Sequence, residues 1–371
     1  MKATQRVVIS AAAAILALAA VVVFLTIKGG CSPDESPSAK ALALVEKALH
    51  NKNQDARMEL YNEAIRVDPR CALAYYRRGV ILATEGKYNL AINDQSKSIE
   101  IDPMYEHAYY EHGLAYLKLH KNKEALEDID KALELDPGYG NAYDARAHYH
   151  ANVGDYQRAL ADHDKALQFR PDDPLYLSNR ANTYCEMGKY DLAIEGATRA
   201  ISLDPHLAVA YRVRAEAYAN AGMPDEAMKD MDHAIAIDPK DAVSWKQRGR
   251  LKAHKGELSA AIADYGKALE IDSGYVLCYV LRSQLYADTN NLQSAIADMT
   301  KAIGLRPDDP MMYFIRAHQY YLNNDRGRAR SDFAKGVEFG GTPPQFLLDE
   351  LGQLAGTSTA PATSSSIGSV E

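Results

Sequence analysis

Apolar residues recur at steps of three and four along most of this chain, the spacing that gathers them on one face of an α-helix. Between Glu106 and Pro137 they form two amphipathic runs, which are joined by a short polar link and closed by Asp136-Pro137. The pattern returns every 34 residues, so that prolines stand at positions 69, 103, 137, 171, 205, 239 and 307. This period predicts an array of helix pairs that bury their apolar faces against one another.

The break inside each predicted pair falls at repeat position 15. The residues there are Gly86, His120, Gly154, Gly188, Gly222, Gly256, Asn290 and Asn324. Glycine and asparagine accept the left-handed turn that ends a helix, and His120 is the exception. The second helix is expected to end at the residue before the proline, because that residue is disfavoured in the helical region.

These copies resemble the tetratricopeptide repeat family, whose pattern has a bulky residue at position 4 and alanine at position 20. Position 4 holds Tyr75, Tyr109, Tyr143, Leu177, Tyr211, Trp245, Tyr279 and Tyr313. Position 20 is alanine without a break from Ala91 to Ala329. The resemblance covers residues 38–343 and implies an all-α, right-handed superhelical solenoid of about nine helix pairs.

A different pattern precedes the repeats. Val7 to Ile27 is a run of 21 residues without a charge, long enough to cross a hydrocarbon core of roughly 30 Å. Lys2 and Arg6 favour a cytoplasmic amino end. We therefore predict a short cytoplasmic segment (1–6), a transmembrane signal anchor (7–27) and a linker (28–37), with the repeats on the extracytoplasmic, periplasmic side of the membrane.

Cys31 leaves a second interpretation open. It follows Gly29-Gly30 directly after the apolar run, an arrangement similar to the processing box of bacterial lipoproteins. Lys28 stands where that box has a leucine-like residue. The alternatives are therefore a cell-envelope lipoprotein acylated at Cys31 and an unmodified cysteine in the linker.

Two segments follow the repeats. Residues 344–355 place Leu347, Leu351 and Leu354 on one helical face, which predicts a helix that caps the array. Residues 356–371 are small and polar and contain too little apolar surface to fold, so we predict a disordered tail.

Composition restricts the partners. The net charge is −8 and no basic stripe is present, so we do not expect nucleic acid as a partner. The four cysteines have no paired spacing, which argues against a disulfide framework and against a zinc site.

A column of basic residues occupies repeat position 7, and a column of aspartates, interrupted by Gly196 in the copy of Arg180, occupies position 23. The basic residues are Arg78, His112, Arg146, Arg180, Arg214, Arg248, Arg282 and Arg316. In the first, degenerate copy both positions turn apolar together, as Leu44 and Leu60. This joint replacement predicts that the two columns contact each other within each copy and serve the fold.

Catalytic signatures are not found. His148, His150 and His163 form a histidine cluster, which we interpret as packing residues, His150 and His163 in the core, in preference to a metal site. H-E-x-x-H, P-loop and G-x-S-x-G sequences do not occur. We expect no enzyme activity, cofactor or bound metal.

The resemblance implies that the first helices of the pairs line a concave groove. The residues expected to contact a partner there are Tyr76, Tyr110, His148, Asn179, Asn182, Arg212, Lys246, Arg250 and Phe314. Amides can hydrogen-bond a peptide main chain and arginine can fork onto a carboxylate, so the run from Asn179 to Arg250 is the first candidate for holding a peptide. The apolar late copies are the second candidate, for hydrophobic side chains of a peptide or for self-association.

These expectations combine into one hypothesis. The chain is predicted to be a membrane-anchored, non-enzymatic adaptor or scaffold that binds another protein or peptide in its groove and contacts the membrane through residues 7–27. The alternatives are the lipoprotein form and a regulatory subunit of an enzyme complex.

Overall fold

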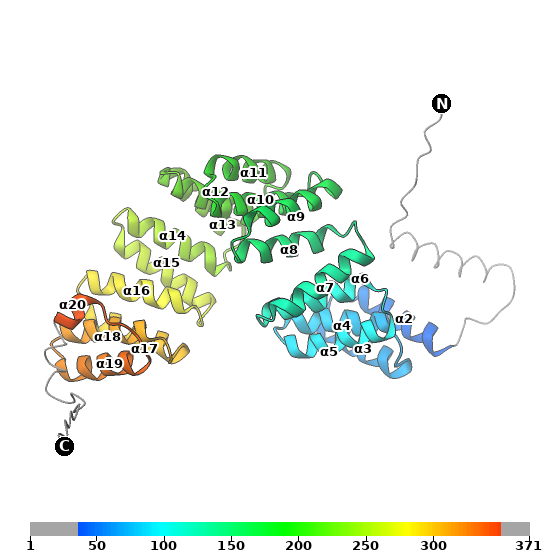
Figure 1. Cartoon of the computed structure of the whole chain (residues 1–371), viewed down its shortest axis with the longest axis horizontal. Coiled ribbons are helices and arrows are strands. Elements are labelled where there is room, and N and C mark those ends of the chain that lie inside the picture. Colours follow the sequence, from blue (N-terminus) through cyan, green and yellow to red (C-terminus); the bar gives the residue numbers. More distant parts are fainter. Residues whose placement is uncertain (1–35, 350–371) are drawn as a thin grey trace, which may run out of the picture. The chain divides into compact units, whose positions relative to one another are not determined.

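The computed structural model describes residues 36–349. Within that range eighteen helices of 13 or 14 residues follow one another in nine pairs, and a short helix comes last (Figure 1). The predicted all-α repeat solenoid of about nine helix pairs is confirmed. The chain divides into two compact units between Phe169 and Arg170. We refer to the described residues on either side of this boundary as unit 1 and unit 2.

Unit 1 contains four helix pairs. They are α2 (Pro37–Leu49) with α3 (Gln54–Val67), α4 (Ala72–Thr84) with α5 (Tyr88–Ile101), α6 (Glu106–Lys118) with α7 (Asn122–Leu135), and α8 (Gly140–Asn152) with α9 (Tyr156–Phe169).

Unit 2 contains five helix pairs and the short last helix. They are α10 (Pro174–Glu186) with α11 (Tyr190–Leu203), α12 (Ala208–Asn220) with α13 (Pro224–Ile237), α14 (Ala242–His254) with α15 (Leu258–Ile271), α16 (Val276–Asp288) with α17 (Leu292–Leu305), α18 (Pro310–Leu322) with α19 (Arg326–Glu338), and α20 (Gln345–Leu347).

Within each unit the helices pack in chain order. Each first helix packs against the second helix of its own pair, and each second helix packs against the first helix that follows. The alanines at repeat position 20 are at most 1% exposed, because the two helices of a pair approach closely there.

In the eight pairs from α4 onward, the turn inside the pair contains a left-handed residue, as predicted. At position 15, φ is +74° at Gly86, +59° at Asn290 and +57° at Asn324. His120 adopts the same conformation with a φ of +58°, although histidine is a less suitable residue for it. The second helices of the first repeats end two residues before the proline, and the intervening Asp102, for example, is extended.

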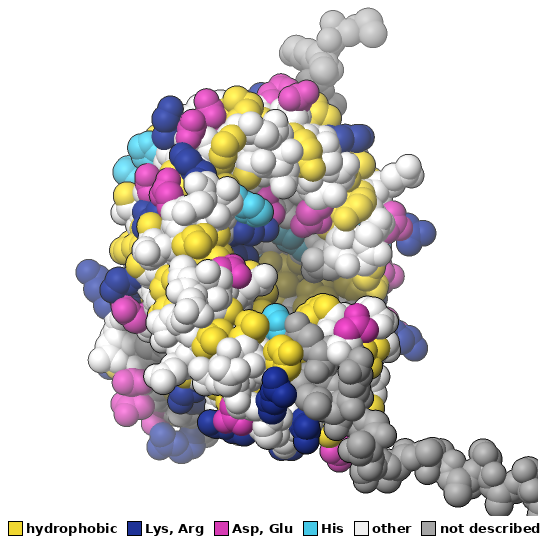
Figure 2. Space-filling view, turned by 90° about the vertical axis from the view of Figure 1, so that its left-hand side faces the viewer, with side chains coloured by type: hydrophobic (Ala, Val, Ile, Leu, Met, Phe, Trp, Pro, Cys, Tyr) yellow, Lys and Arg dark blue, Asp and Glu magenta, His cyan; other side chains and the backbone are white. Residues whose placement is uncertain are grey.

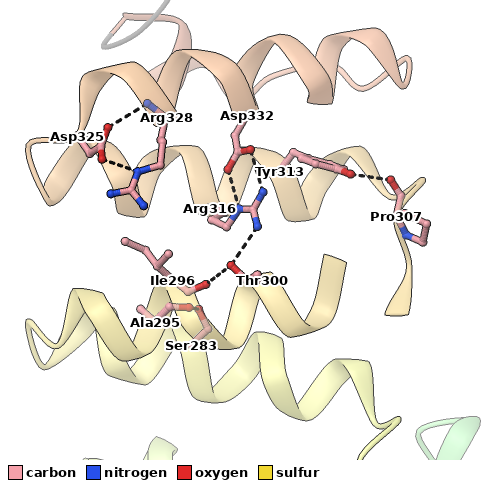
Figure 3. A network of polar contacts seen from close by, with 10 residues as sticks. All are labelled: Ser283, Ala295, Ile296, Thr300, Pro307, Tyr313, Arg316, Asp325, Arg328 and Asp332. Atoms are coloured by element: carbon pink, nitrogen blue, oxygen red, sulfur yellow. Dashed lines mark hydrogen bonds and ion pairs between the residues drawn. The ribbon is translucent and has the colours of Figure 1, made fainter. Parts of the chain in front are cut away.

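The predicted contact between the columns at positions 7 and 23 is confirmed. In six copies the arginine donates two hydrogen bonds of 2.7–2.9 Å, through Nε and Nη2, to both carboxylate oxygens. The six pairs are Arg78–Asp94, Arg146–Asp162, Arg214–Asp230, Arg248–Asp264, Arg282–Asp298 and Arg316–Asp332. Figure 3 shows the Arg316–Asp332 pair, whose Nη1 also donates to the Thr300 hydroxyl at 3.0 Å. In the copy with His112, Nδ1 of that ring lies 2.8 Å from Asp128 Oδ2.

The prediction of a single-pass membrane protein with periplasmic repeats is corrected. No helix among residues 36–349 is long and apolar enough to cross a membrane. The longest have 14 residues, or about 21 Å, which is shorter than the roughly 30 Å of a hydrocarbon core. The expected anchor over residues 7–27, Cys31 and residues 356–371 lie outside the described residues.

After the last pair, the chain turns back onto α18. Leu347 of α20 is fully buried in a cluster with Phe314, Ala317 and Tyr320. Leu351 and Leu354 of the expected capping helix lie outside the described residues.

Candidate binding surfaces

Five rings form a continuous aromatic surface on unit 1. Tyr76 meets Tyr105 edge to face with ring centres 5.0 Å apart, and Tyr105 stacks on His107 at 5.7 Å. His107 stacks in turn on Tyr139 at 4.9 Å, and Tyr139 lies 5.0 Å from Tyr110. These are separations of favourable aromatic pairs. The structure thus joins the predicted residues Tyr76 and Tyr110 through three further rings, and we call the five residues the aromatic surface.

The helix starts explain how these rings meet. Tyr105 and Tyr139 directly precede α6 and α8, while Tyr76, His107 and Tyr110 lie on the first helices α4 and α6. Tyr76 is 6% exposed and is therefore a buried member of the surface, whereas the other four rings are partly exposed.

Two carboxylates of α6 border the aromatic surface. Glu106 Oε1 lies 3.0 Å from His107 Nδ1. Glu111 is partly buried, and within residues 36–349 its carboxylate has neither a hydrogen bond nor an ion pair. Burial raises the pKa of Glu111, while the Arg77 guanidinium acts in the opposite direction. Burial and, second, the charge of Glu111 raise the pKa of the Tyr76 phenol.

The predicted histidine cluster is divided between two carboxylates. His163 is fully buried, as expected of a core residue, and its Nδ1 lies 3.1 Å from Asp144 Oδ1. His148 is exposed on α8 with Nε2 3.7 Å from Asp144 Oδ2, and His150 Nε2 lies 3.9 Å from Asp162 Oδ2. In the described part of the chain, no group of three or more His, Cys, Asp or Glu side chains is arranged to hold a metal ion.

Unit 2 gathers three cations on neighbouring first helices. Arg212 on α12 has Nε 3.5 Å from Asp241 Oδ2. Lys246 on α14 has Nζ 6.0 Å from the centre of the Tyr275 ring, and Arg250 lies one turn further along α14 in an exposed position. We call Arg212, Lys246 and Arg250 the basic cluster.

The pKa of Lys246 is shifted by burial and by the charges around it in the basic cluster. Burial lowers this pKa, and the charges of Arg250 and Arg212 lower it further, against the opposite effect of Glu216. The Glu216 carboxylate already accepts a hydrogen bond of 2.9 Å from Gln247 Nε2. The three cations of the basic cluster thus have two carboxylates beside them, Glu216 and Asp241, and this excess of one positive charge favours a bound anion.

The two predicted asparagines do not extend the basic cluster. Asn179 is 9% exposed on α10, so it belongs to the packed part of the repeat. Asn182 donates a hydrogen bond of 2.8 Å to Glu186 on its own helix. The structure thus narrows the predicted run from Asn179 to Arg250 to its three cations.

The late apolar positions form a cavity of about 440 Å³ at the end of unit 2. It is lined by Val280, Gln284, Ala287, Asp288, Met311, Phe314, Ile315, His318, Gln319, Leu322, Pro344 and Phe346. The predicted residue Phe314 is buried in its wall, whereas Met311, Leu322 and Phe346 are about half exposed. Apolar side chains beside a hollow are visible in the view toward this end of the molecule (Figure 2). We call this site the apolar cavity.

Several contributors were not predicted from the sequence. Tyr105 and Tyr139 precede their helices at repeat position 34, where the periodicity indicates a turn. Tyrosine recurs at the same repeat position as Tyr275, which lies beside Lys246. This recurrence was the sequence signal that could have identified Tyr105 and Tyr139 as surface residues. Phe346 belongs to the segment after the repeats, whose contacts the 34-residue period does not specify.

Comparisons with known proteins agree on the repeat. One tetratricopeptide repeat model matches residues 106–139, 242–275 and 277–309, and another matches residues 50–103 and 179–242. Together the matches cover more than half of the chain. Comparison with curated proteins finds no match.

Two solved structures illustrate the similarity of fold. A tetratricopeptide repeat protein from Parabacteroides merdae is 21% identical, with a TM-score of 0.57 over 66% of this chain and 98% of that one. The APC/C hetero-tetramer Cut9-Hcn1 contains a chain that is 16% identical, with a TM-score of 0.57 over 81% of this chain and 59% of that one. At these identities the similarity concerns the fold alone.

Proposed function

The chain belongs to the tetratricopeptide repeat family, and from that premise we propose that it is a non-enzymatic adaptor that holds an acidic segment of another protein on unit 2. The basic cluster is the observation that supports this proposal. Three cations lie near two carboxylates, Glu216, which is already hydrogen-bonded to Gln247, and Asp241, which lies 3.5 Å from Arg212.

The physical argument is electrostatic. Repulsion among Arg212, Lys246 and Arg250 is relieved when an anion binds, and a partly buried setting strengthens that attraction relative to open solvent. Arginine can present two parallel donors to a carboxylate, and lysine adds a point charge. An aspartate, a glutamate or a chain-terminal carboxylate of the partner supplies the matching group.

The apolar cavity supplies the second contact of the same partner. Its lining contains eight apolar residues and one carboxylate, Asp288, so it suits a bulky apolar side chain. An acidic residue and, further along, a large apolar residue therefore define the recognised segment.

The test is selection of peptides from a displayed random library by the full chain, followed by fluorescence anisotropy with the selected peptides. We expect acidic peptides to be selected and Lys246→Glu combined with Arg250→Glu to weaken their binding by about tenfold or more. Lys229→Glu, an exposed charge reversal on α13, is the matched control and should change binding less than about twofold. Peptides without acidic residues, or binding unchanged in the double variant, contradict the proposal.

Self-association is the second candidate use of the apolar cavity, because Met311, Leu322 and Phe346 expose large apolar areas at its rim. Sedimentation velocity separates the two uses. A dimer that dissociates in Met311→Glu supports self-association, whereas a monomer whose peptide affinity falls in Met311→Glu supports the peptide site.

A further inference from the structure

The aromatic surface of unit 1 has the opposite chemistry to the basic cluster. Its five rings are bordered by Glu106 and Glu111, and the nearby cation is Arg77. Arg77 lies over the Tyr76 ring with Cζ 5.2 Å from the ring centre, so this surface already holds one guanidinium against a tyrosine face. Tyrosine faces attract cations because the ring quadrupole is negative there.

Glu111 carries the argument further. Its carboxylate is partly buried beside the rings, and among residues 36–349 it has no ion-pair or hydrogen-bond partner. Glu106, in contrast, contacts His107 at 3.0 Å. A partly desolvated carboxylate without a partner lowers its free energy when a cation with N–H donors binds.

We propose that the aromatic surface and Glu111 bind an arginine side chain of a partner protein. The guanidinium stacks on a partly exposed ring such as Tyr110 or Tyr139 and donates to the Glu111 carboxylate. Charge complementarity selects a cation over an anion or an uncharged apolar group. The unpaired carboxylate selects a cation with N–H donors over a quaternary ammonium, which has none.

This inference goes beyond the proposed function, because it concerns another unit and a ligand of opposite charge. A chain that holds a carboxylate on unit 2 and a guanidinium on unit 1 recognises partner segments of both signs. Failure of one site leaves the other intact.

The test uses the full chain and a fluorescein-labelled Gly-Ser peptide that carries two arginines, with fluorescence anisotropy as the measurement. The comparison peptide replaces arginine by citrulline, which keeps the shape and removes the charge. We expect the citrulline peptide to bind at least about tenfold more weakly than the arginine peptide. Equal binding of the two peptides overturns the proposal.

Variants locate the site. Glu111→Gln, which keeps the shape of the side chain, should weaken arginine-peptide binding about tenfold, and Tyr110→Leu should weaken it about fivefold. Tyr110→Phe keeps the ring and should retain binding within about twofold. The matched control is Glu127→Gln, which removes the same charge from an exposed position on α7.

Two results overturn the assignment to this surface. One is an equal loss of arginine-peptide affinity in Glu127→Gln and Glu111→Gln. Equal losses would mean that the peptide is bound by the net negative charge of the chain and not by this surface. The other is unchanged binding in Glu111→Gln. Tyr110 packs against Tyr139, so its replacement could disturb the fold, and circular dichroism checks the helix content of each variant. If Tyr110→Leu is unfolded, the result for Glu111→Gln decides the test. Lys246→Glu should leave arginine-peptide binding unweakened.

Discussion

Unit 1 and unit 2 share a scaffold and differ on the exposed faces of their first helices. Both use bidentate Arg–Asp pairs, a left-handed residue at the turn of every pair from α4 onward and buried alanines between paired helices. On these faces unit 1 presents tyrosines with Glu106 and Glu111, whereas unit 2 presents the basic cluster and then the apolar cavity.

The difference shows which positions the fold constrains. Packing restricts position 20 to alanine and pairs positions 7 and 23, because a change there leaves a clash or an unpaired buried charge. Exposed positions of the first helices carry no such constraint, so they can differ in charge between copies without cost to the array. The shared scaffold and the contrasting faces can each be tested.

The largest expected effect concerns the shared scaffold. Arg146→Met in unit 1 and Arg214→Met in unit 2 each leave a buried aspartate, Asp162 or Asp230, without its main partner. We expect each change to lower the free energy of unfolding by about 3 kcal/mol, measured from urea unfolding followed by circular dichroism. Similar losses in the two units support a common scaffold.

The control removes both charges. Arg146→Leu combined with Asp162→Leu should recover much of the loss, because a well-packed apolar pair can replace a buried ion pair. If the double variant unfolds as early as the single one, the ion pair is not the source of the loss.

A smaller effect sharpens the contrast between the two faces. Burial raises the pKa of Glu111, so its carboxylate is neutralised at a higher pH than an ordinary glutamate. On acidification from neutral pH, arginine-peptide binding should therefore begin to weaken at a higher pH than an ordinary glutamate would cause, by up to about tenfold once the carboxylate is neutral. Burial, Arg250 and Arg212 lower the pKa of Lys246, so this side chain loses its charge at a lower pH than an ordinary lysine does. As pH rises above neutrality, acidic peptides should therefore begin to lose affinity earlier than they would at a site with an ordinary lysine.

Anisotropy titrations across the pH range measure both trends. His107 of α6 contacts Glu106 beside the same rings, so its contribution has to be separated from that of Glu111. The comparison of wild type with Glu111→Gln therefore isolates the carboxylate. If both ligands weaken on the same side of neutrality, the two faces do not have the opposite chemistry described above.

The smallest effect concerns the copy in which a histidine replaces the arginine. His112 makes a single contact with Asp128 through Nδ1, whereas arginine makes two parallel hydrogen bonds in six other copies. His112→Arg should therefore raise the free energy of unfolding by about 0.5–1 kcal/mol, less the lost contact of His112 with Tyr116. A raised thermal midpoint supports this expectation, and a lowered one shows that the imidazole packs better than the pair.

The repeat and its internal pairing could be predicted from the sequence because each rests on a residue pattern that recurs in fixed register. The joint change to Leu44 and Leu60 in the first copy indicates by itself that positions 7 and 23 are in contact. His120 could not be predicted in the same way, because the surrounding helices impose its left-handed turn on a residue that does not favour it.

The candidate sites were only partly predictable. Periodicity assigns a residue to a helix face, but neighbouring helices decide its exposure, and so Asn179 and Phe314 proved to be buried. Tyr139 lies before a helix start, where the period indicates a turn, yet it joins two other rings. The apolar cavity depends on Phe346, which lies beyond the last regular copy.

The arginines at position 7 have a further contact that bears on how such a chain lengthens. Nη1 of Arg146 reaches Asp130 at 2.5 Å, and Nη1 of Arg248 reaches Asp232 at 2.7 Å, in each case on the second helix of the preceding copy. Five of the six arginines paired with aspartate therefore contact two neighbouring copies at once, through Asn62, Asp130, Thr198, Asp232 or Thr300, and Arg282, which has Gly266 at that place, is the exception. Tandem duplication of one complete copy reproduces the contacts of its arginine with its own copy and with the preceding one. An insertion of any other length within a copy disrupts these contacts at that point.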